Sequence, residues 1–197
     1  MDTATPQYMA ILQGLQRIVS ELDFAMGACE RLIEQYDIKE NRVAAPVLFF
    51  VLLPALFDHL MLAAARLYEK KGDRSIQRLL RIVQSMPTEI PWKDQGFSVS
   101  EIMRQQSLIE SNASLLEKLK VRRDKVLAHM DKDYFNDPGK IEKDYPITIL
   151  ELLNLLRATQ ALLAAHAQAV GLGVPISFGD WIGVLTDRMV NTLREHR

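Results

Sequence analysis

Apolar residues recur every three or four positions along most of this chain, which is the spacing of one face of an α-helix. The first such run includes Leu12, Leu15 and Leu22 and begins near Pro6, a residue favoured in the first turn of a helix. It predicts one long helix over about residues 5–37. No stretch alternates apolar and polar residues for long enough to predict a strand. The pattern therefore predicts an all-α fold.

A second block, over about residues 43–71, is apolar on nearly every helical face. Its most apolar part, residues 43–57, has 15 residues without a charge, whereas a membrane-spanning helix needs about 20. We therefore expect a buried core helix at the centre of the fold rather than a membrane segment. Pro54 lies inside the block and removes a backbone hydrogen bond, so it should kink the helix.

Breakers and caps outline the remaining helices. They are expected over about residues 73–85, 98–130, 146–170 and 177–197. Two pairs, Ser98 with Glu101 and Thr148 with Glu151, have the spacing of a capping box, in which each side chain bonds the backbone N–H of the other residue. Ser177 is expected to cap the last helix.

Proline and glycine predict loops at residues 86–97 and 131–145, and the second contains the turn signal Asn-Asp-Pro-Gly. No flexible polar stretch is long enough to separate two independent cores. We therefore predict a single domain over residues 1–197, with a core of four to five long antiparallel helices over about residues 5–170 and a C-terminal helical extension over residues 172–197. The extension could cover the core or pack against a second copy of the chain.

The chain has 24 Lys and Arg against 25 Asp and Glu, a formal net charge of -1. This balance excludes a wholly basic nucleic-acid binder and an acidic tail protein. Residues 118–132, however, carry six Lys and Arg against two acidic residues, so the even balance conceals a local basic site. The single cysteine, Cys29, excludes an intramolecular disulfide and a multi-thiolate metal site. No signal-peptide pattern begins the chain, so we expect a cytoplasmic protein.

Common catalytic templates, such as a phosphate-binding glycine loop or a metal-binding His-Glu-x-x-His helix, are absent from the sequence. The basic segment ends in His129, a side chain able to transfer protons at neutral pH. On a uniform α-helix, Lys125 lies about 40° and Arg122 about 20° from His129, whereas Arg123 lies about 120° away. The wheel favours Arg122, and either arginine could be the partner of His129.

Histidine and arginine together suit RNA cleavage without a metal or another cofactor. The ribose 2′-OH would attack the neighbouring phosphodiester, His129 would act as general base or acid, and an arginine would stabilise the charge on the phosphorane. One histidine is half of an acid–base pair, and a symmetric dimer would supply a second. The competing interpretation is a solvated helix end whose basic residues complement the helix dipole. His59, in the apolar second block, is interpreted as a hydrogen-bonded core histidine.

Residues 123–129, Arg-Asp-Lys-Val-Leu-Ala-His, resemble the signature of the HEPN domains: an arginine, a polar residue, and a histidine after four to six intervening positions. Five positions intervene here. Residues 65–69, Ala-Arg-Leu-Tyr-Glu, are similar to the abortive-infection branch of that superfamily, although Glu69 stands where Asp is frequent. The resemblance covers roughly residues 5–170.

The resemblance implies a helical bundle that forms a homodimer with a composite active site, as in metal-independent endoribonucleases of phage exclusion and toxin–antitoxin systems. In such systems a partner protein holds the toxin in check. By position, the resemblance gives the catalytic roles to Arg123 and His129 in this sequence, with Asp124 as the polar residue that orients one of them.

Three further cations, Arg122, Lys125 and Lys132, are expected to bind the RNA backbone. The leading hypothesis is therefore a cytoplasmic HEPN-type RNA endonuclease that forms a homodimer, uses no metal or cofactor, has no membrane partner, and is controlled by an antitoxin or another regulatory protein. The alternative is a non-catalytic HEPN-like module that binds nucleotide or RNA, or scaffolds a partner. The intact pair of Arg123 and His129 favours the enzyme, because a scaffold would not need it.

Overall fold

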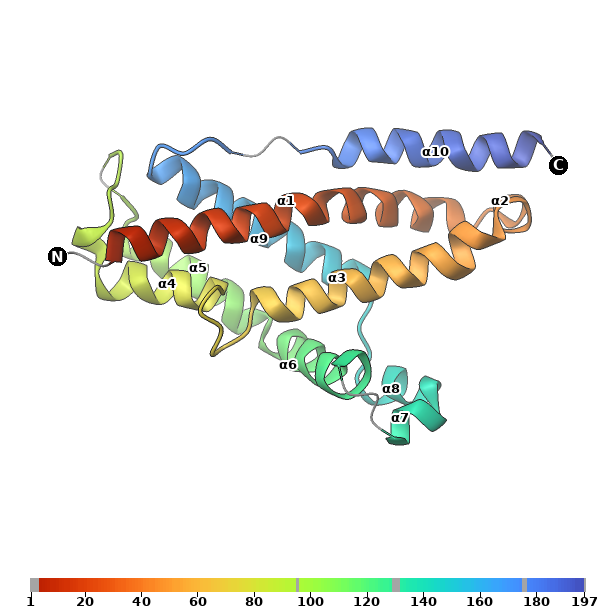
Figure 1. The fold of residues 1–197 in the computed structure, drawn as a ribbon, viewed down its shortest axis with the longest axis horizontal. Coiled ribbons are helices and arrows are strands. Elements are labelled where there is room, and N and C mark those ends of the chain that lie inside the picture. The colour runs from red at the N-terminus through yellow and green to blue at the C-terminus, as the bar shows by residue number, and fades with distance from the viewer. Residues whose placement is uncertain (1–3, 95, 129–131, 175–176, 197) are drawn as a thin grey trace. The chain divides into compact units, whose positions relative to one another are not determined.

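The computed structural model of this protein describes residues 4–94, 96–128, 132–174 and 177–196 (Figure 1). All regular elements in these residues are helical, so the all-α prediction is confirmed. The α-helices are α1 (Ala4–Tyr36), α2 (Lys39–Ala44), α3 (Leu53–Leu67), α4 (Ile76–Ser85), α5 (Val99–Ser111), α6 (Ala113–Arg122), α7 (Lys132–Asn136), α8 (Pro138–Asp144), α9 (Ile149–Ala169) and α10 (Gly179–Glu195). Wider π-helical turns form η1 (Leu48–Leu52) and η3 (Arg123–Ala128), and a 3-10 turn forms η2 (Pro87–Glu89).

The chain divides into two compact units. The large unit is built from Met1–Val19 and Leu62–Pro175, and the small unit from Ser20–Met61 and Ile176–Arg197. Helices α1 and α3 each contribute residues to both units. A single domain over the whole chain stays a prediction.

The large unit has a core of leucine and isoleucine side chains. They come from the first half of α1, from α4 and from α9, and include Leu12, Leu15, Ile76, Leu79, Leu152, Leu155 and Leu156. Helix α9 begins with the predicted capping box: the Thr148 hydroxyl accepts from the backbone N–H of Glu151 at 3.2 Å, and the Glu151 carboxylate accepts from the N–H of Thr148 at 2.8 Å. The local sequence signal at this helix start is confirmed.

The helix predicted over residues 98–130 is divided into three pieces, α5, α6 and η3. The division between α5 and α6 falls at Asn112, whose side-chain amide donates to the carbonyl of Leu108 at 2.8 Å. That carbonyl would accept the backbone N–H of residue 112 in a continuous helix, so the asparagine side chain competes with the helix. At the start of α5 only one half of the predicted capping box forms: the Ser98 hydroxyl accepts from the N–H of Glu101 at 3.2 Å. The Glu101 carboxylate accepts from Arg104 and Gln105 instead.

The prediction of a loop over residues 131–145 is wrong for most of the residues that the structure describes in this range. This stretch forms the short helices α7 and α8. The turn signal marks the point where α7 ends and α8 begins, and Pro138 occupies the first position of α8, where its missing N–H costs no hydrogen bond.

The small unit holds α10 against α1 by an acidic cap that the sequence did not indicate. Asp23 accepts hydrogen bonds from the backbone N–H groups of Phe178 at 2.6 Å and Gly179 at 2.9 Å. Ser177, the predicted cap, donates its hydroxyl to Asp23 at 2.9 Å, and its Oγ accepts from the N–H of Gly179 only at 3.4 Å. The prediction of Ser177 as the cap is therefore corrected, because a carboxylate from α1 takes that role.

The prediction of a buried central helix over residues 43–57 is also wrong for much of its length. Leu48 and Phe49 pack in a cluster with Leu32 and Val190. On the other side of the same segment the side chains of Val43, Val47, Phe50 and Val51 are 54–65% exposed. Apolar composition on every face did not place every face in the core.

The π-helical turn η1 ends two residues before Pro54, where a kink was predicted. Proline cannot donate to the carbonyl four residues earlier, that of Phe50, and its ring clashes with that carbonyl, so a wider turn accommodates it. The stretch Leu48–Leu67 is long and apolar enough to cross a membrane by length and composition, with a mean hydropathy of 2.0. One such helix is weak evidence for a membrane segment, since a core helix can have the same composition.

Candidate functional site

The basic segment singled out by the sequence forms the end of α6 and the π-helical turn η3, both in the large unit. A π-helical turn bonds residue i to i+5, and such turns occur frequently at functional sites. The uniform turn of 100° per residue, on which Arg122 was favoured over Arg123, does not hold across residues 123–128.

The two arginines at the start of this turn have different environments. Arg122 is buried, with 5% of its surface exposed. The side chain of Arg123 is 19% exposed and reaches two carboxylates. Burial argues against a direct phosphate contact by Arg122, so its predicted role in RNA binding gains no support from its position. Arg123 is the arginine that a ligand can reach.

Arg123 is held by two acidic side chains from different parts of the large unit. Its Nε and Nη2 donate to Oδ1 of Asp124 at 2.8 and 2.7 Å, and its Nη1 donates to Oε1 of Glu69 at 3.3 Å. The hydrogen bonds to Asp124 and the charges of both carboxylates raise the pKa of the Arg123 guanidinium above its ordinary value. The guanidinium therefore stays protonated and oriented.

Glu69 is placed by its neighbour in the sequence. Tyr68 is buried, and its hydroxyl hydrogen-bonds the hydroxyl of Thr159 on α9 at 2.6 Å. Burial raises the pKa of Tyr68 to about 12, so this phenol stays neutral. Because Tyr68 ties the turn after α3 to α9, the next residue presents its carboxylate to Arg123. Glu69 appeared in the sequence only as a departure from a motif, and its contact with Arg123 was not predicted.

The Arg123 guanidinium keeps donors for a ligand. It has five N–H groups. The bonds to Asp124 and Glu69 use three of them, which leaves one N–H on each terminal nitrogen without a partner among the described residues. Guanidinium N–H groups are strong donors to phosphate oxygens. Asp124 thus bonds two nitrogens of the Arg123 guanidinium, and its role in a catalytic site stays a prediction.

Lys125, predicted to bind RNA, lies near two aromatic rings. Its ammonium lies 5.1 Å from the ring centre of Tyr134 and 6.0 Å from that of Tyr145. The Tyr134 hydroxyl donates to Asp144 at 3.2 Å, which links α7 with α8. A cation near the face of an aromatic ring gains about 0.5–2 kcal/mol, so these contacts give Lys125 a packing role. Its role in RNA binding stays a prediction.

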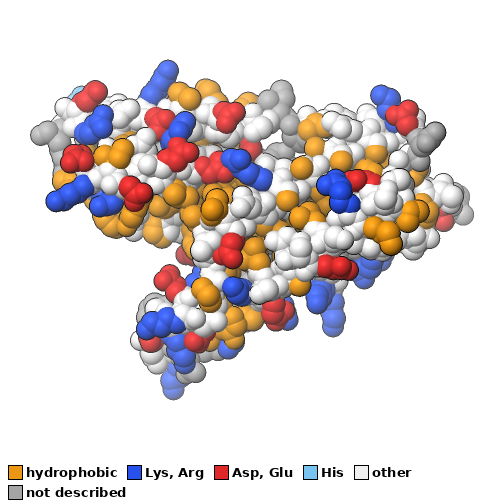
Figure 2. Space-filling model, turned by 180° about the vertical axis from the view of Figure 1, so that it is seen from behind, with side chains coloured by type: hydrophobic (Ala, Val, Ile, Leu, Met, Phe, Trp, Pro, Cys, Tyr) orange, Lys and Arg blue, Asp and Glu red, His pale blue; other side chains and the backbone are white. Residues whose placement is uncertain are grey.

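Two other predicted residues complete the segment. Lys132 is exposed at the start of α7. His129, the predicted acid or base, lies outside the described residues. Figure 2 shows Lys and Arg side chains gathered over α7 and α8, at the bottom of that view, with acidic side chains between them. Within the ranges that the structure describes, no group of three or more His, Cys, Asp and Glu side chains could hold a metal ion.

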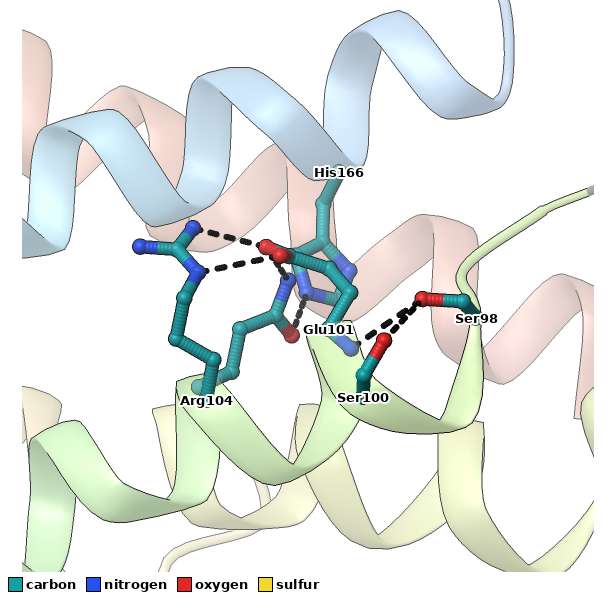
Figure 3. A network of polar contacts seen from close by, with 6 residues as sticks. Ser98, Ser100, Glu101, Arg104 and His166 are labelled. Carbon is teal, nitrogen blue, oxygen red and sulfur yellow. Dashed lines mark hydrogen bonds and ion pairs between the residues drawn. The ribbon is translucent and has the colours of Figure 1, made fainter.

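A second polar site in the large unit contains a histidine to which the sequence assigned no role (Figure 3). His166 of α9 is fully buried; its Nδ1 lies 2.9 Å from the Tyr8 hydroxyl and its Nε2 2.9 Å from Oε1 of Gln105. Burial lowers the pKa of His166 to about 4. Since a carbonyl oxygen can only accept, Nε2 carries the proton and Nδ1 accepts from Tyr8.

The site around His166 has a structural role. Both ring nitrogens are satisfied by protein groups, and Gln105 is held in turn by Glu101, which pairs with Arg104 at 2.7 Å (Figure 3). The prediction of a core histidine was made for His59, which is exposed on α3. That prediction is wrong, and His166 is the histidine that fills such a position. The 3.6-residue period of apolar residues was a signal for a buried position at residue 166, because His166 shares a helical face with Leu162 and Leu163.

Comparison with known proteins gives one family. The model of a HEPN family described as AbiU2 matches residues 12–183. The matched range contains Glu69, Arg123 and His129. No curated protein and no solved structure matches the chain.

Proposed function

The chain belongs to the AbiU2 family of HEPN domains, an abortive-infection family, and we propose that it is a metal-independent RNA endonuclease that acts as a homodimer. The observation that carries this proposal is the state of Arg123. Its guanidinium is fixed by Asp124 and Glu69, half-buried, and left with two N–H groups for a phosphate. Such pre-orientation is what electrostatic stabilisation of a transition state requires.

The proposed reaction is an internal transfer at phosphorus. The ribose 2′-OH attacks the adjacent phosphodiester, and one His129 takes its proton. Arg123 donates two hydrogen bonds to the phosphorane oxygens, where negative charge grows. The P–O5′ bond then breaks, and a second imidazole, in its protonated form, gives a proton to the leaving oxygen. The products are a 2′,3′-cyclic phosphate and a 5′-hydroxyl end, so the atoms and protons balance.

This chemistry supports a dimer. The reaction needs one neutral and one protonated imidazole, and the segment around Arg123 contains a single histidine, His129. A twofold axis that brings two copies of the segment together supplies both. Within this proposal Lys132 contacts neighbouring phosphates, the protein acts in the cytoplasm in phage defence, and an antitoxin or another regulatory protein restrains it.

The test is incubation of the purified protein with total RNA in EDTA, followed by analysis of the fragment ends. We expect His129→Ala to lower the cleavage rate about 10²–10⁴-fold. We expect Arg123→Ala to lower it about 10²–10³-fold, since it removes the donors to the phosphorane. Asp124→Asn should lower the rate while RNA binding is retained, because it loosens Arg123 without removing its charge.

Two matched variants serve as controls. Arg104→Ala removes an arginine with a similar carboxylate pair on α5, and His59→Ala removes an exposed histidine on α3. Both should cleave at the wild-type rate. Cleavage that persists in His129→Ala and Arg123→Ala, or that EDTA abolishes, contradicts the proposal. Binding of RNA without any cleavage would favour the alternative of a non-catalytic HEPN module.

A further inference from the structure

Helix α10 of the small unit turns its bulky apolar side chains away from that unit. Trp181, Val184 and Leu185 are 58, 46 and 37% exposed. They occupy positions i, i+3 and i+4 of one helical face, and the exposed Arg188 continues this face at i+7. A surface helix of a monomer ordinarily turns such a stripe to the core. In α10 this apolar stripe is exposed instead of facing the core.

The opposite face of α10 is small and is docked on α1 by specific contacts. Its buried residues are Gly183, Thr186 and Val190. Asp23 caps the N-terminus of α10, and Arg31 pairs with Asp187 at 3.1 Å between Nε and Oδ2. The approach at Gly27 is so close that a Cβ there would lie 2.8 Å from Cα of Gly179. Rotating α10 to bury Trp181 would break all of these contacts, so the outward orientation is fixed.

We propose that α10 pairs in antiparallel orientation with α10 of a second copy of this chain, about a twofold axis between Val184 and Leu185. In this register Trp181 faces the partner's Arg188, and Val184 faces the partner's Leu185. Each contact occurs twice, as in every isologous interface.

Three features favour a second copy as the occupant. The two ends of this face complement each other when two copies pair in antiparallel orientation. The Arg188 guanidinium lies seven residues from the Trp181 indole, and a cation over an indole ring forms the strongest type of cation–π contact. Antiparallel helices also place opposite ends of their dipoles together. At one edge of the face, Phe24 and Phe178 stack at 5.5 Å between ring centres and are 40 and 45% exposed, which extends the apolar surface.

The small size of this face determines how strongly two copies are expected to associate. Helix α10 has 17 residues and is about 25 Å long. A single helix pair buries less than the roughly 800 Å² per partner of a standard interface, so the association should be weak and depend on concentration. Val184, Leu185 and Arg188 lie beyond the residues that the family model matches, whereas Trp181 lies inside them. The inference does not rest on nuclease activity.

The first test is the mass of the full chain in solution over a range of concentrations. Leu185→Glu places like charges beside the twofold axis and should lower the mass at high concentration twofold. Val99→Glu and Met103→Glu are matched controls, because these α5 side chains are 74 and 62% exposed and lie in the large unit. Both should keep the wild-type mass.

The second test is the register. Trp181→Cys on one copy and Arg188→Cys on another should form a disulfide when the two variants are mixed and oxidised. Each variant alone should cross-link poorly, since identical positions lie about 10 Å apart along the pair. The native Cys29 is fully buried, so it does not compete.

An unchanged mass in Leu185→Glu overturns the proposal, even if the protein is a dimer through another surface. A chain that is monomeric at all concentrations also overturns it, and so does one that uses Trp181 to bind phospholipid vesicles without self-association. An unchanged mass in Leu185→Glu or vesicle binding would leave the proposed nuclease untouched, because the RNA cleavage assay measures the Arg123 site. A chain that is monomeric at all concentrations would contradict the homodimeric nuclease as well.

Discussion

At the scale of single residues, burial and partners give two basic side chains opposite charge states. His166 is fully enclosed, and its neighbours are the neutral groups of Tyr8 and Gln105. Desolvation dominates there and favours the neutral imidazole. Arg123 is partly enclosed beside Asp124 and Glu69, and their charges keep it protonated. The first side chain supports the core, and the second is available for chemistry.

The charge state of His166 predicts a dependence of stability on pH. Its pKa falls from 6.5 in the unfolded chain to about 4 in the folded protein, so between these values the unfolded state binds more protons. Stability is therefore complete above pH 6.5 and is lost as the pH falls. The expected loss from this residue is about 2 kcal/mol between pH 6.5 and 5. Urea unfolding at a series of pH values measures it.

His166→Gln should flatten this dependence, because the group that takes up the proton is gone. His59→Gln removes an exposed histidine and should keep the wild-type slope. If His166→Gln and the wild type lost the same free energy between pH 6.5 and 5, carboxylates rather than His166 would set the slope.

At the scale of elements, α1 contains two glycines with different surroundings. A Cβ at Gly14 would meet nothing within 4 Å, whereas a Cβ at Gly27 would meet the backbone of Gly179. The first glycine only adds freedom to the unfolded chain, and the second permits α10 to approach. The same residue type in one helix therefore has two different effects on stability.

This contrast predicts opposite results for two identical substitutions. Gly27→Ala should lower the free energy of unfolding by about 1–3 kcal/mol, because the backbone of α10 must move and strain the Asp23 cap. Gly14→Ala should raise it by about 0.5–1 kcal/mol. Urea unfolding compares the two variants with the wild type. Equal effects of the two substitutions would mean that α10 does not dock on Gly27 in solution.

The two π-helical turns differ in how well the sequence accounts for them. Pro54 explains η1, because its ring and its missing N–H disturb the turn before it. Nothing in the local sequence of Arg123–Ala128 explains η3. That turn nevertheless changes which side chains share a face, and for this reason the helical wheel favoured Arg122 while the structure exposes Arg123.

At the scale of the whole molecule, the proposed nuclease site needs two copies of the chain. If each site uses both His129 side chains, a dimer with one His129→Ala chain is inactive. In an equal mixture after subunit exchange, about one quarter of the dimers carry two intact copies, so activity per wild-type chain should fall to about half. The measurement is the RNA cleavage rate as the fraction of variant rises.

Mixing with Arg104→Ala provides the control, since that chain should form fully active dimers with the wild type. A rate strictly proportional to the amount of wild-type chain in the His129→Ala mixture would mean that one copy holds a complete site. That outcome would remove the composite site and leave the pairing of α10 to be judged by its own tests.

The sequence by itself determined the features that depend on neighbours along the chain. The apolar period predicted the ends of α1 and α9 to within about three residues. The Thr148 capping box formed as predicted, and the Ser98 hydroxyl formed one half of the other predicted capping box. The basic segment before His129 and its resemblance to HEPN domains could also be recognised from the sequence, because both are patterns of residue types. Helix periodicity and helix caps depend on residues three or four positions apart, so the amino-acid sequence alone is enough to predict them.

Only the tertiary structure decided the features that join distant segments. Asp23 caps a helix more than 150 positions away, and Glu69 holds Arg123 across 54 positions. Composition could not tell that one side of residues 43–57 is exposed, or that α10 faces outward. These outcomes depend on which surfaces pack together in the folded chain. The burial, pKa and accessibility of a side chain follow from that tertiary packing rather than from its neighbours in the sequence.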